Sequence, residues 1–121
     1  MPSGAQTVLF VVSLASLLAG LANAADPADL GARLYAERCS ACHGDEGRGD
    51  GPTAPALVPK PRNFRDPALW AERTIEQMRD TVRHGKPGTM MPPFEGVLTD
   101  EEIAAVVDHV SGFKPHAASA K

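Results

Sequence analysis

The feature that most limits what this chain can fold into is the pentapeptide Cys39-Ser40-Ala41-Cys42-His43, which holds its only two cysteines. The spacing C-x-x-C-H is typical of covalent haem attachment, in which both thiols add to vinyl groups of the porphyrin and the adjacent imidazole binds the iron. One helical turn sets the two sulfur atoms over the ring edge. Cys39, Cys42 and His43 are therefore the candidate residues for binding one haem c.

Two other uses of a C-x-x-C pair explain this chain less well. A structural zinc site requires four ligands, and there is no second cysteine pair. A thioredoxin-like dithiol belongs in a βαβ context, and no alternating strand pattern of useful length occurs here. A haem would also supply apolar mass that the sequence lacks, since only five aromatic residues follow residue 25 while the chain holds eleven Gly and eleven Pro.

The first twenty-five residues carry no charged side chain and contain an apolar run from Thr7 to Ala22. This run is shorter than the ~20 residues that a membrane span needs, so it fits the apolar region of a secretory signal peptide. Small residues at Ala22 and Ala24 indicate cleavage before Ala25. We expect residues 1–24 to be a signal peptide and 25–121 the mature domain, located in a bacterial periplasm. An uncleaved membrane anchor is the alternative.

Capping signals predict an all-α fold. Asp26 followed by Pro27 predicts a helix that runs to about residue 39, and Asp66 opens a short helical segment through residue 70. Capping-box patterns at Thr74 and Thr99 predict two more helices, which end at the glycines of positions 85 and 112. The expected buried faces of these last two helices consist of Ile75, Met78 and Val82, and of Ile103, Val106, Val107 and Val110.

Beyond the pentapeptide, nearly the whole of residues 25–121 resembles the class I cytochromes c. The resemblance is carried by Gly31 and Tyr35, by GRGDGP from Gly47, by MPPF from Met91, and by LTDEEI before the last helix. It implies three to five helices around one covalently bound haem, with the first and last helices crossing. The segments 44–61 and 85–93, rich in Gly and Pro, are then the loops that wrap the haem.

An electron carrier needs a second axial ligand to the iron, and a thioether favours the ferrous form and raises the potential. Met1 is lost with the leader, and Met78 lies on a helical apolar stripe, which leaves Met90 and Met91 in a Gly- and Pro-rich loop. Pro92 restricts Met91 to extended conformations and so preorganises it. The Met-Pro pairing of the resembled family also selects Met91, with Met90 as the alternative ligand.

The other histidines have ordinary explanations. His84 is a rival axial ligand, but it lies at a predicted helix C-terminus, where a partly cationic imidazole is favoured by the helix dipole. His109 stands where the family commonly has an aromatic residue that faces Gly31 and Tyr35. We expect it to lie at the helix crossing or on the surface rather than to bind iron.

The same resemblance gives candidates for two further hydrogen bonds around the haem, one from the proximal imidazole and one to a propionate. A proximal imidazole usually donates its other ring N–H to a backbone carbonyl, and a proline carbonyl in the following loop does so in this family. Pro55, in Pro55-Ala56-Leu57, matches the family pattern and is the expected acceptor for His43, with Pro52 as a weaker match. Trp70 is expected either to donate its indole N–H to a haem propionate or only to pack.

The charge is uneven along the chain. Residues 60–90 hold seven Lys or Arg against four acids, whereas the whole chain has a formal net charge of −3. These bases form either a cationic side near the haem edge or a solvated helix face with local ion pairs. The seven are Lys60, Arg62, Arg65, Arg73, Arg79, Arg83 and Lys86. A net negative charge with no basic run excludes a nucleic-acid binder.

The sequence therefore predicts a periplasmic monohaem electron carrier that transforms no substrate and is not an enzyme. Its expected partners are a redox donor and acceptor protein, such as an oxidase, reductase or dehydrogenase. We expect a monomer that meets the membrane only transiently unless the leader is retained. The alternatives are an electron-transfer subunit of a membrane-associated respiratory or dehydrogenase complex, and a peroxidase-like or gas-binding haem protein with a weak sixth ligand.

Overall fold

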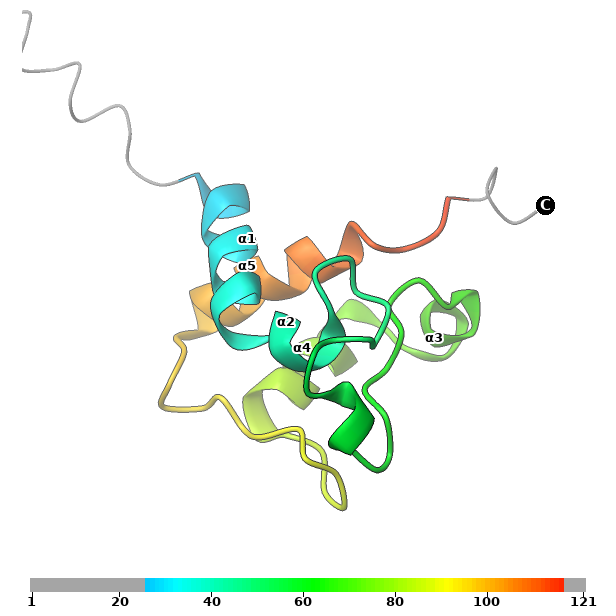
Figure 1. Ribbon diagram of the computed structural model, residues 1–121. Coiled ribbons are helices and arrows are strands. Elements are labelled where there is room, and N and C mark those ends of the chain that lie inside the picture. The colour runs from blue at the N-terminus through cyan, green and yellow to red at the C-terminus, as the bar shows by residue number, and fades with distance from the viewer. Residues whose placement is uncertain (1–25, 117–121) are drawn as a thin grey trace, which may run out of the picture.

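The computed structural model describes residues 26–116, which form a small helical domain (Figure 1). The predicted signal peptide lies outside the described residues. The elements in chain order are α1 (Pro27–Arg38), α2 (Ser40–His43), the 3₁₀ helix η2 (Ala54–Ala56), α3 (Pro67–Glu72), α4 (Ile75–His84) and α5 (Asp100–Ser111). The described part of the chain contains no strand beyond one isolated bridge between Glu95 and Leu98. The prediction of an all-α fold is thus confirmed.

The helix starts lie where the capping residues predicted them. The Asp26 carboxylate accepts from the backbone N–H of Ala28 at the start of α1. Both α4 and α5 begin with complete capping boxes, in which Thr74 pairs with Gln77 and Thr99 with Glu102. Each reciprocal pair satisfies backbone donors that the helix itself leaves free. Local chemistry therefore defines where these helices begin.

Helices α1 and α5 cross at Gly31, where their backbones come into direct contact (Figure 1). A Cβ atom at this position would collide with the carbonyl oxygen of Ala105, so only glycine allows the approach. The crossing that the resemblance implied is present, and it anchors the core. The buried hydrophobic cluster consists of Leu34, Tyr35, Phe94, Leu98, Ile103, Val106, Val107 and Val110.

The two predicted apolar stripes differ in burial. The stripe of α5 is buried throughout, with Ile103, Val106 and Val107 each only 1% exposed. On α4 the corresponding residues Ile75, Met78 and Val82 are half-buried and pack at the margin of the core. Met78 and Val82 also line a cavity, so α4 forms the boundary between the core and that cavity.

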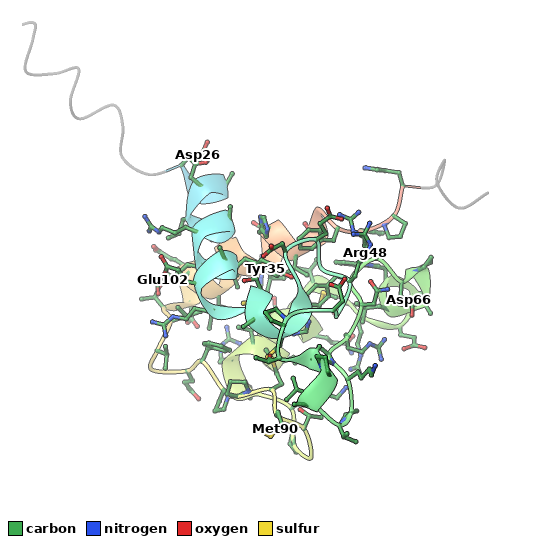
Figure 2. The ribbon with its side chains drawn as sticks, viewed as in Figure 1. Asp26, Tyr35, Arg48, Asp66, Met90 and Glu102 are labelled. Carbon is green, nitrogen blue, oxygen red and sulfur yellow. The ribbon has the colours of Figure 1, made fainter. Side chains whose placement is uncertain are left out.

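His109 lies within an aromatic cluster at the helix crossing. Its ring centroid is 5.0 Å from that of Tyr35 and 5.3 Å from that of Phe113, which it meets edge to face. His109 therefore occupies the aromatic place that the resemblance left open, as a helix-crossing residue. Figure 2 shows Tyr35, which belongs to α1, toward the middle of the molecule, whereas Met90 lies at the edge.

None of the helices formed by residues 26–116 is long and apolar enough to cross a membrane.

Candidate haem-binding site

The cysteine pair is presented by the single turn α2. Cys39 ends α1 and also precedes α2, and its carbonyl accepts from the backbone N–H of His43 at 2.9 Å. Gly44 ends the turn with a φ of 83°, a left-handed conformation that glycine adopts without strain. Both cysteines and His43 therefore lie on one short rigid unit. The two cysteines are not joined in a disulfide.

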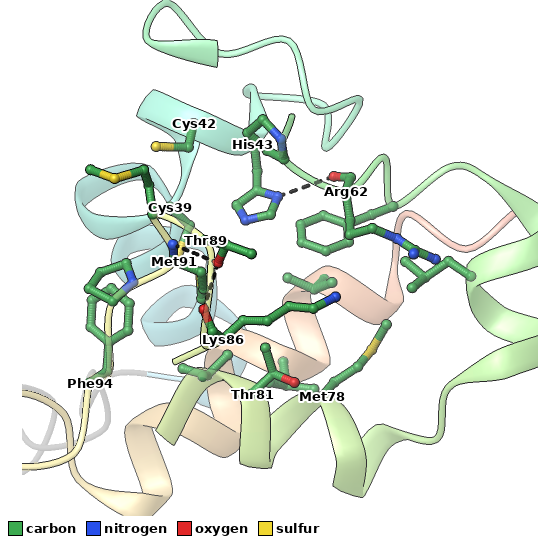
Figure 3. Close-up of a pocket in the computed structure, with 18 of the residues that line it drawn as sticks. Cys39, Cys42, His43, Arg62, Met78, Thr81, Lys86, Thr89, Met91 and Phe94 are labelled. Atoms are coloured by element: carbon green, nitrogen blue, oxygen red, sulfur yellow. Dashed lines mark hydrogen bonds between the residues drawn. The ribbon is translucent and has the colours of Figure 1, made fainter. Parts of the chain in front are cut away.

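A cavity of about 330 Å³ opens beside α2, within the ~300–1,000 Å³ range of cofactor sites. Cys39, Cys42, His43 and Met91 all line it. Figure 3 shows Cys42 and His43 on one side of the cavity and Met78 and Thr81 of α4 on the other. Its other apolar walls are formed by Leu57, Pro59, Pro61, Phe64, Leu69, Val82, Pro92, Phe94, Val107 and Val110.

The His43 ring is fixed by a hydrogen bond to the chain. Its Nδ1 lies 3.2 Å from the carbonyl oxygen of Arg62, and because a carbonyl can only accept, Nδ1 carries the proton. The lone pair then lies on Nε2, the atom left free to bind iron. Burial lowers the pKa of His43, and the bond to Arg62 only partly opposes this, so the imidazole is held in the neutral form that metal binding requires.

The acceptor for His43 is Arg62, and the expectation that it would be Pro55 is corrected. Pro55 is exposed in the 3₁₀ helix η2, and the hydrogen bond of the His43 ring goes to the Arg62 carbonyl instead. Pro52 is exposed as well. The acceptor comes later in the chain because segment 44–61 loops away before residues 61–65 return beside His43. A proline immediately before the acceptor, Pro61, was the signal that sequence reasoning passed over.

Trp70 does not reach the cavity. Its indole Nε1 donates to the carbonyl of Phe64 at 2.7 Å, and Trp70 is absent from the cavity lining. The only N–H of the indole is thereby used, so the packing alternative is favoured over a hydrogen bond to a propionate. Phe64, which sequence reasoning did not single out, stacks on the His43 ring with centroids 4.5 Å apart and planes 17° apart.

The electrostatics of the cysteines disfavour a redox dithiol. Burial, and to a lesser extent the neighbouring Cys42, raise the pKa of the Cys39 thiol to about 11. A reactive dithiol requires the opposite, a thiolate stabilised at neutral pH. No group of three or more His, Cys, Asp or Glu residues suitable for holding a metal ion occurs among residues 26–116. These observations fit thiols that form thioethers and disfavour a zinc or thioredoxin-like site.

Met91 is held in place by its loop, and Met90 is not. The Met91 N–H donates to Thr89 Oγ1 at 3.1 Å, and its carbonyl accepts from Lys86 N at 3.2 Å. Met91 is half-buried and packs against the core, whereas Met90 lies at the cavity rim and is 70% exposed. Gly85 has a φ of 71° and no room for a Cβ beside Met91, so the turn requires glycine. The geometry favours Met91.

Six of the seven bases of the predicted cationic segment divide into two groups, and the seventh, Arg65, donates its Nε–H to the Glu46 carbonyl. Lys60, Arg62, Arg73 and Lys86 line the cavity together with Arg38 of α1, and no carboxylate among the described residues lines it. Arg79 and Arg83 instead pair with acids of α4 and α5, at 2.9 to 3.8 Å. Both expectations thus hold, each for a different part of the segment. The cavity has a positive rim that suits anionic propionates.

The rival ligand His84 lies away from the site. It is exposed, it does not line the cavity, and its Nδ1 lies 3.6 Å from a carboxylate oxygen of Glu95. His43 is the one histidine that lines the cavity among residues 26–116.

Comparison with known proteins agrees with this site. The family model described as cytochrome c oxidase, cbb3-type, subunit III matches residues 26–110. The dihydro-heme d1 dehydrogenase of Pseudomonas aeruginosa is 36% identical over 104 residues, which cover 84% of this chain and 18% of that protein. Cytochrome c-554(548) of Halomonas halodenitrificans is 34% identical over 73 residues, which cover 60% of this chain and 81% of the relative.

Among solved structures, the KustC0563 c-type cytochrome is similar with a TM-score of 0.58 and 36% identity, over 70% of this chain and 98% of that one. The chain spans only 18%, 59% and 62% of the first three curated relatives. The fold and the site together define a class I c-type cytochrome, which carries one covalently bound haem c. The chain belongs to the family described as cytochrome c oxidase, cbb3-type, subunit III.

Proposed function

We propose that the protein is a periplasmic one-electron carrier whose haem c is attached through Cys39 and Cys42. His43 is the proximal axial ligand, and Met91 is the distal ligand. The observation that carries this proposal is that two thiols, a neutral imidazole and a loop-held thioether line one apolar cavity. Residues 1–24 serve as the signal peptide that directs the domain to the periplasm.

The bound haem supplies the one-electron chemistry, a change between ferric and ferrous iron. The residues of the chain keep the surroundings constant during that change. His43 is fixed by Arg62 and Phe64, and the Met91 backbone is fixed by Thr89 and Lys86. Apolar walls exclude water, and a thioether favours the ferrous state. Such a site can exchange electrons with little reorganisation.

The rim of the cavity is the proposed contact face for redox partners. Val58 is 87% exposed and Met90 70% exposed, and both lie in segments that border the cavity. Lys60 and Lys86 line the same cavity, and neither forms an ion pair within residues 26–116. Apolar side chains surrounded by unpaired positive charge suit a partner with an acidic docking surface. The net negative charge of the chain lies elsewhere.

The proposal is tested by producing the full chain in a bacterium that attaches haem c and isolating the periplasmic fraction. A haem that stays with the protein through acid-acetone extraction, together with reversible redox titration that follows a one-electron curve, is the expected result. Loss of the colour on extraction would contradict covalent attachment. Rapid carbon monoxide binding by the ferrous protein would contradict Met91 ligation and support a gas-binding or peroxidase-like protein.

A second candidate is an electron-transfer subunit of a larger complex. The family description names an oxidase subunit, and a solved structure similar to this chain, with a TM-score of 0.63 and 32% identity, is a Kuenenia stuttgartiensis reducing HAO-like protein complex. This chain covers 42% of that structure's chain. Copurification of the tagged chain with an integral membrane complex in its own organism would favour the subunit over the free carrier. The site chemistry is the same in both.

We propose that the chain itself is not an enzyme, although one relative is named a dehydrogenase. Among the described residues, His43 is the one histidine that lines the cavity. It is held by the hydrogen bond to Arg62 and lies beside the cysteines, so it does not serve as a separate acid–base group. An enzyme needs an open iron position with an acid–base group beside it. With Met91 as the distal ligand, its loop would close that position.

A further inference from the structure

Residues 61–65, named here the proximal segment, make two contacts with His43. The Arg62 carbonyl accepts from Nδ1 at 3.2 Å, and the Phe64 ring stacks on the imidazole at 4.5 Å. A hydrogen bond and a stacked ring restrict different motions of the imidazole, its in-plane shift and its rotation. The position of this one segment therefore determines how the His43 ring is oriented.

The proximal segment is held from two sides. On the α2 side, the N–H of Phe64 donates to the carbonyl of Gly47 at 2.7 Å, and Arg65 Nε donates to the carbonyl of Glu46 at 2.7 Å. On the α3 side, Trp70 Nε1 donates to the carbonyl of Phe64 at 2.7 Å. Phe64 thus has both backbone groups engaged, one on each side. The backbone of Phe64, which carries the ring, cannot move without weakening one of these bonds.

The α3 side carries a second, weaker tie. Arg62 lies 3.6 Å from the carboxylate of Glu72, two residues after Trp70, and both side chains are largely exposed. Exposed ion pairs contribute little, ~0–1 kcal/mol, so the part-buried indole hydrogen bond is the stronger of the two. The ring of Phe113 lies nearly parallel to that of Phe64, with the two centroids 6.4 Å apart.

We propose that Trp70 is a positioning residue for the proximal histidine, acting through its hydrogen bond to the Phe64 carbonyl. The inference rests on the proposed role of His43 as an iron ligand. It gives α3, which lies outside the haem-binding motif, a part in setting the properties of the iron. Trp70 does so from behind the proximal segment, without touching the cavity.

The physical consequence is a change in ligand strength. A firm Nδ1–H hydrogen bond raises the basicity of the imidazole, and a more basic ligand favours the ferric state. When the proximal segment loosens, the hydrogen bond from His43 to Arg62 weakens, and the ferrous state is stabilised relative to the ferric state. Removing the indole N–H therefore raises the reduction potential and changes the orientation of the imidazole plane.

The test compares Trp70→Phe with the wild type, both as haem-loaded full chains. Phenylalanine keeps an aromatic ring but lacks the N–H. We expect a higher reduction potential and an altered pattern of haem-methyl resonances in the ferric NMR spectrum, which reports the imidazole orientation. Glu72→Gln should shift both readouts in the same direction by less. Glu76→Gln, the same charge change at a pair remote from the segment, should leave the methyl pattern unchanged.

A Trp70→Phe protein with lower thermal stability but the wild-type potential and methyl pattern would overturn the inference, since a purely structural role moves only stability. If Trp70→Phe does not accumulate, Phe64→Leu provides the second measurement. It removes the stack on His43 and should also alter the methyl pattern, and an unchanged pattern would overturn the inference. A wild type without covalent haem would instead overturn the proposed role of His43, so the two failures are distinguishable.

Discussion

The phenolic hydroxyl of Tyr35 donates a hydrogen bond of 2.7 Å to the carbonyl oxygen of Gly44, nine residues further along the chain. This bond ties α1 to the end of the turn that carries Cys42 and His43. Tyr35 is 2% exposed, and burial raises the pKa of its hydroxyl, so the group remains a neutral donor. The haem-binding turn is thereby joined to the helix crossing.

Replacing Tyr35 by Phe removes one of the two donors to the buried Gly44 carbonyl, which also accepts from Gly47 N–H at 3.1 Å, so the expected cost is that of one hydrogen bond, about 0.5–1.5 kcal/mol. We expect the midpoint of guanidinium unfolding of the haem-loaded protein to fall accordingly. Ser40→Ala, which removes an exposed hydroxyl-to-backbone bond on Ala36, is the matched control and should change the midpoint little. Equal midpoints for Tyr35→Phe and the wild type would show that the bond contributes nothing.

Met91 and Met90 are adjacent, which permits a direct comparison. Met91→Ala should abolish the weak red sulfur-to-iron charge-transfer band of the ferric protein and lower the reduction potential. Met90→Ala should retain the band, because Met90 is 70% exposed. If the band survives in Met91→Ala and disappears in Met90→Ala, the ligand assignment is reversed.

The pKa of His109 is lowered by burial from its usual value of about 6.5. The folded protein therefore binds fewer protons here than the unfolded chain, and its stability falls as the pH drops below about 6.5 toward the lowered value. His109→Phe keeps an aromatic ring beside Tyr35 and Phe113 and should remove this part of the pH dependence.

The measurement for His109 is the difference in unfolding free energy between wild type and variant as a function of pH. The difference should be constant above pH 7 and should change in favour of His109→Phe in acid. His84→Gln serves as the control histidine and should leave the contribution of His109 in place. A pH-independent difference between wild type and His109→Phe would contradict the prediction.

The rate at which ferricyanide oxidises the ferrous protein distinguishes the effect of the local charge at the cavity rim from that of the net charge of the chain. The net charge of −3 predicts repulsion of this anion, whereas the positive rim predicts attraction. We expect the second-order rate to fall with rising ionic strength, and to fall about tenfold in the variant Lys60→Glu/Lys86→Glu at low salt. Arg33→Glu, an exposed change on α1, is the control and should have a smaller effect. A rate that rises with salt would refute the rim as the site of electron exchange.

Haem is expected to be necessary for stable folding. Among residues 26–116, the largest fully buried side chains are Ile103, Val106 and Val107, which make a small core for a domain of this size. A Cys39→Ala/Cys42→Ala variant, produced without attached haem, should show no cooperative thermal transition by circular dichroism. A cooperative melt of that variant would show that the protein part folds alone.

The helices could be predicted from the sequence because their determinants are local. Asp26, Thr74 and Thr99 act within three residues of themselves, and the structure places the helix starts at all three. The haem-binding residues could be predicted for the same reason, since Cys39, Cys42 and His43 lie within one turn. Motifs confined to a single turn or cap depend little on the rest of the fold.

The residues that contact His43 from a distance could not be predicted in the same way. The acceptor is Arg62, nineteen residues after His43, and its place depends on the path of the whole intervening loop. Pro55 matched a short pattern, but it lies exposed in η2, and the acceptor of the His43 hydrogen bond is Arg62. For Trp70 the sequence leaves two alternatives open, a hydrogen bond to a propionate or packing alone, and in the structure its N–H is used by a carbonyl six residues earlier. A pattern in the sequence does not specify which of several backbone carbonyls the loop brings beside the His43 ring.

Because of the backbone contact between Gly31 and Ala105, the helix crossing tolerates substitutions less well than the loops do. Because no side chain separates the two helices there, the distance between them at this pivot is fixed by the backbones. The crossing therefore cannot widen to admit a larger cofactor or substrate. Variation in cavity size and in rim charge must come from the loops between the helices. Homologous chains that serve different partners should therefore share the pivot and differ around the rim.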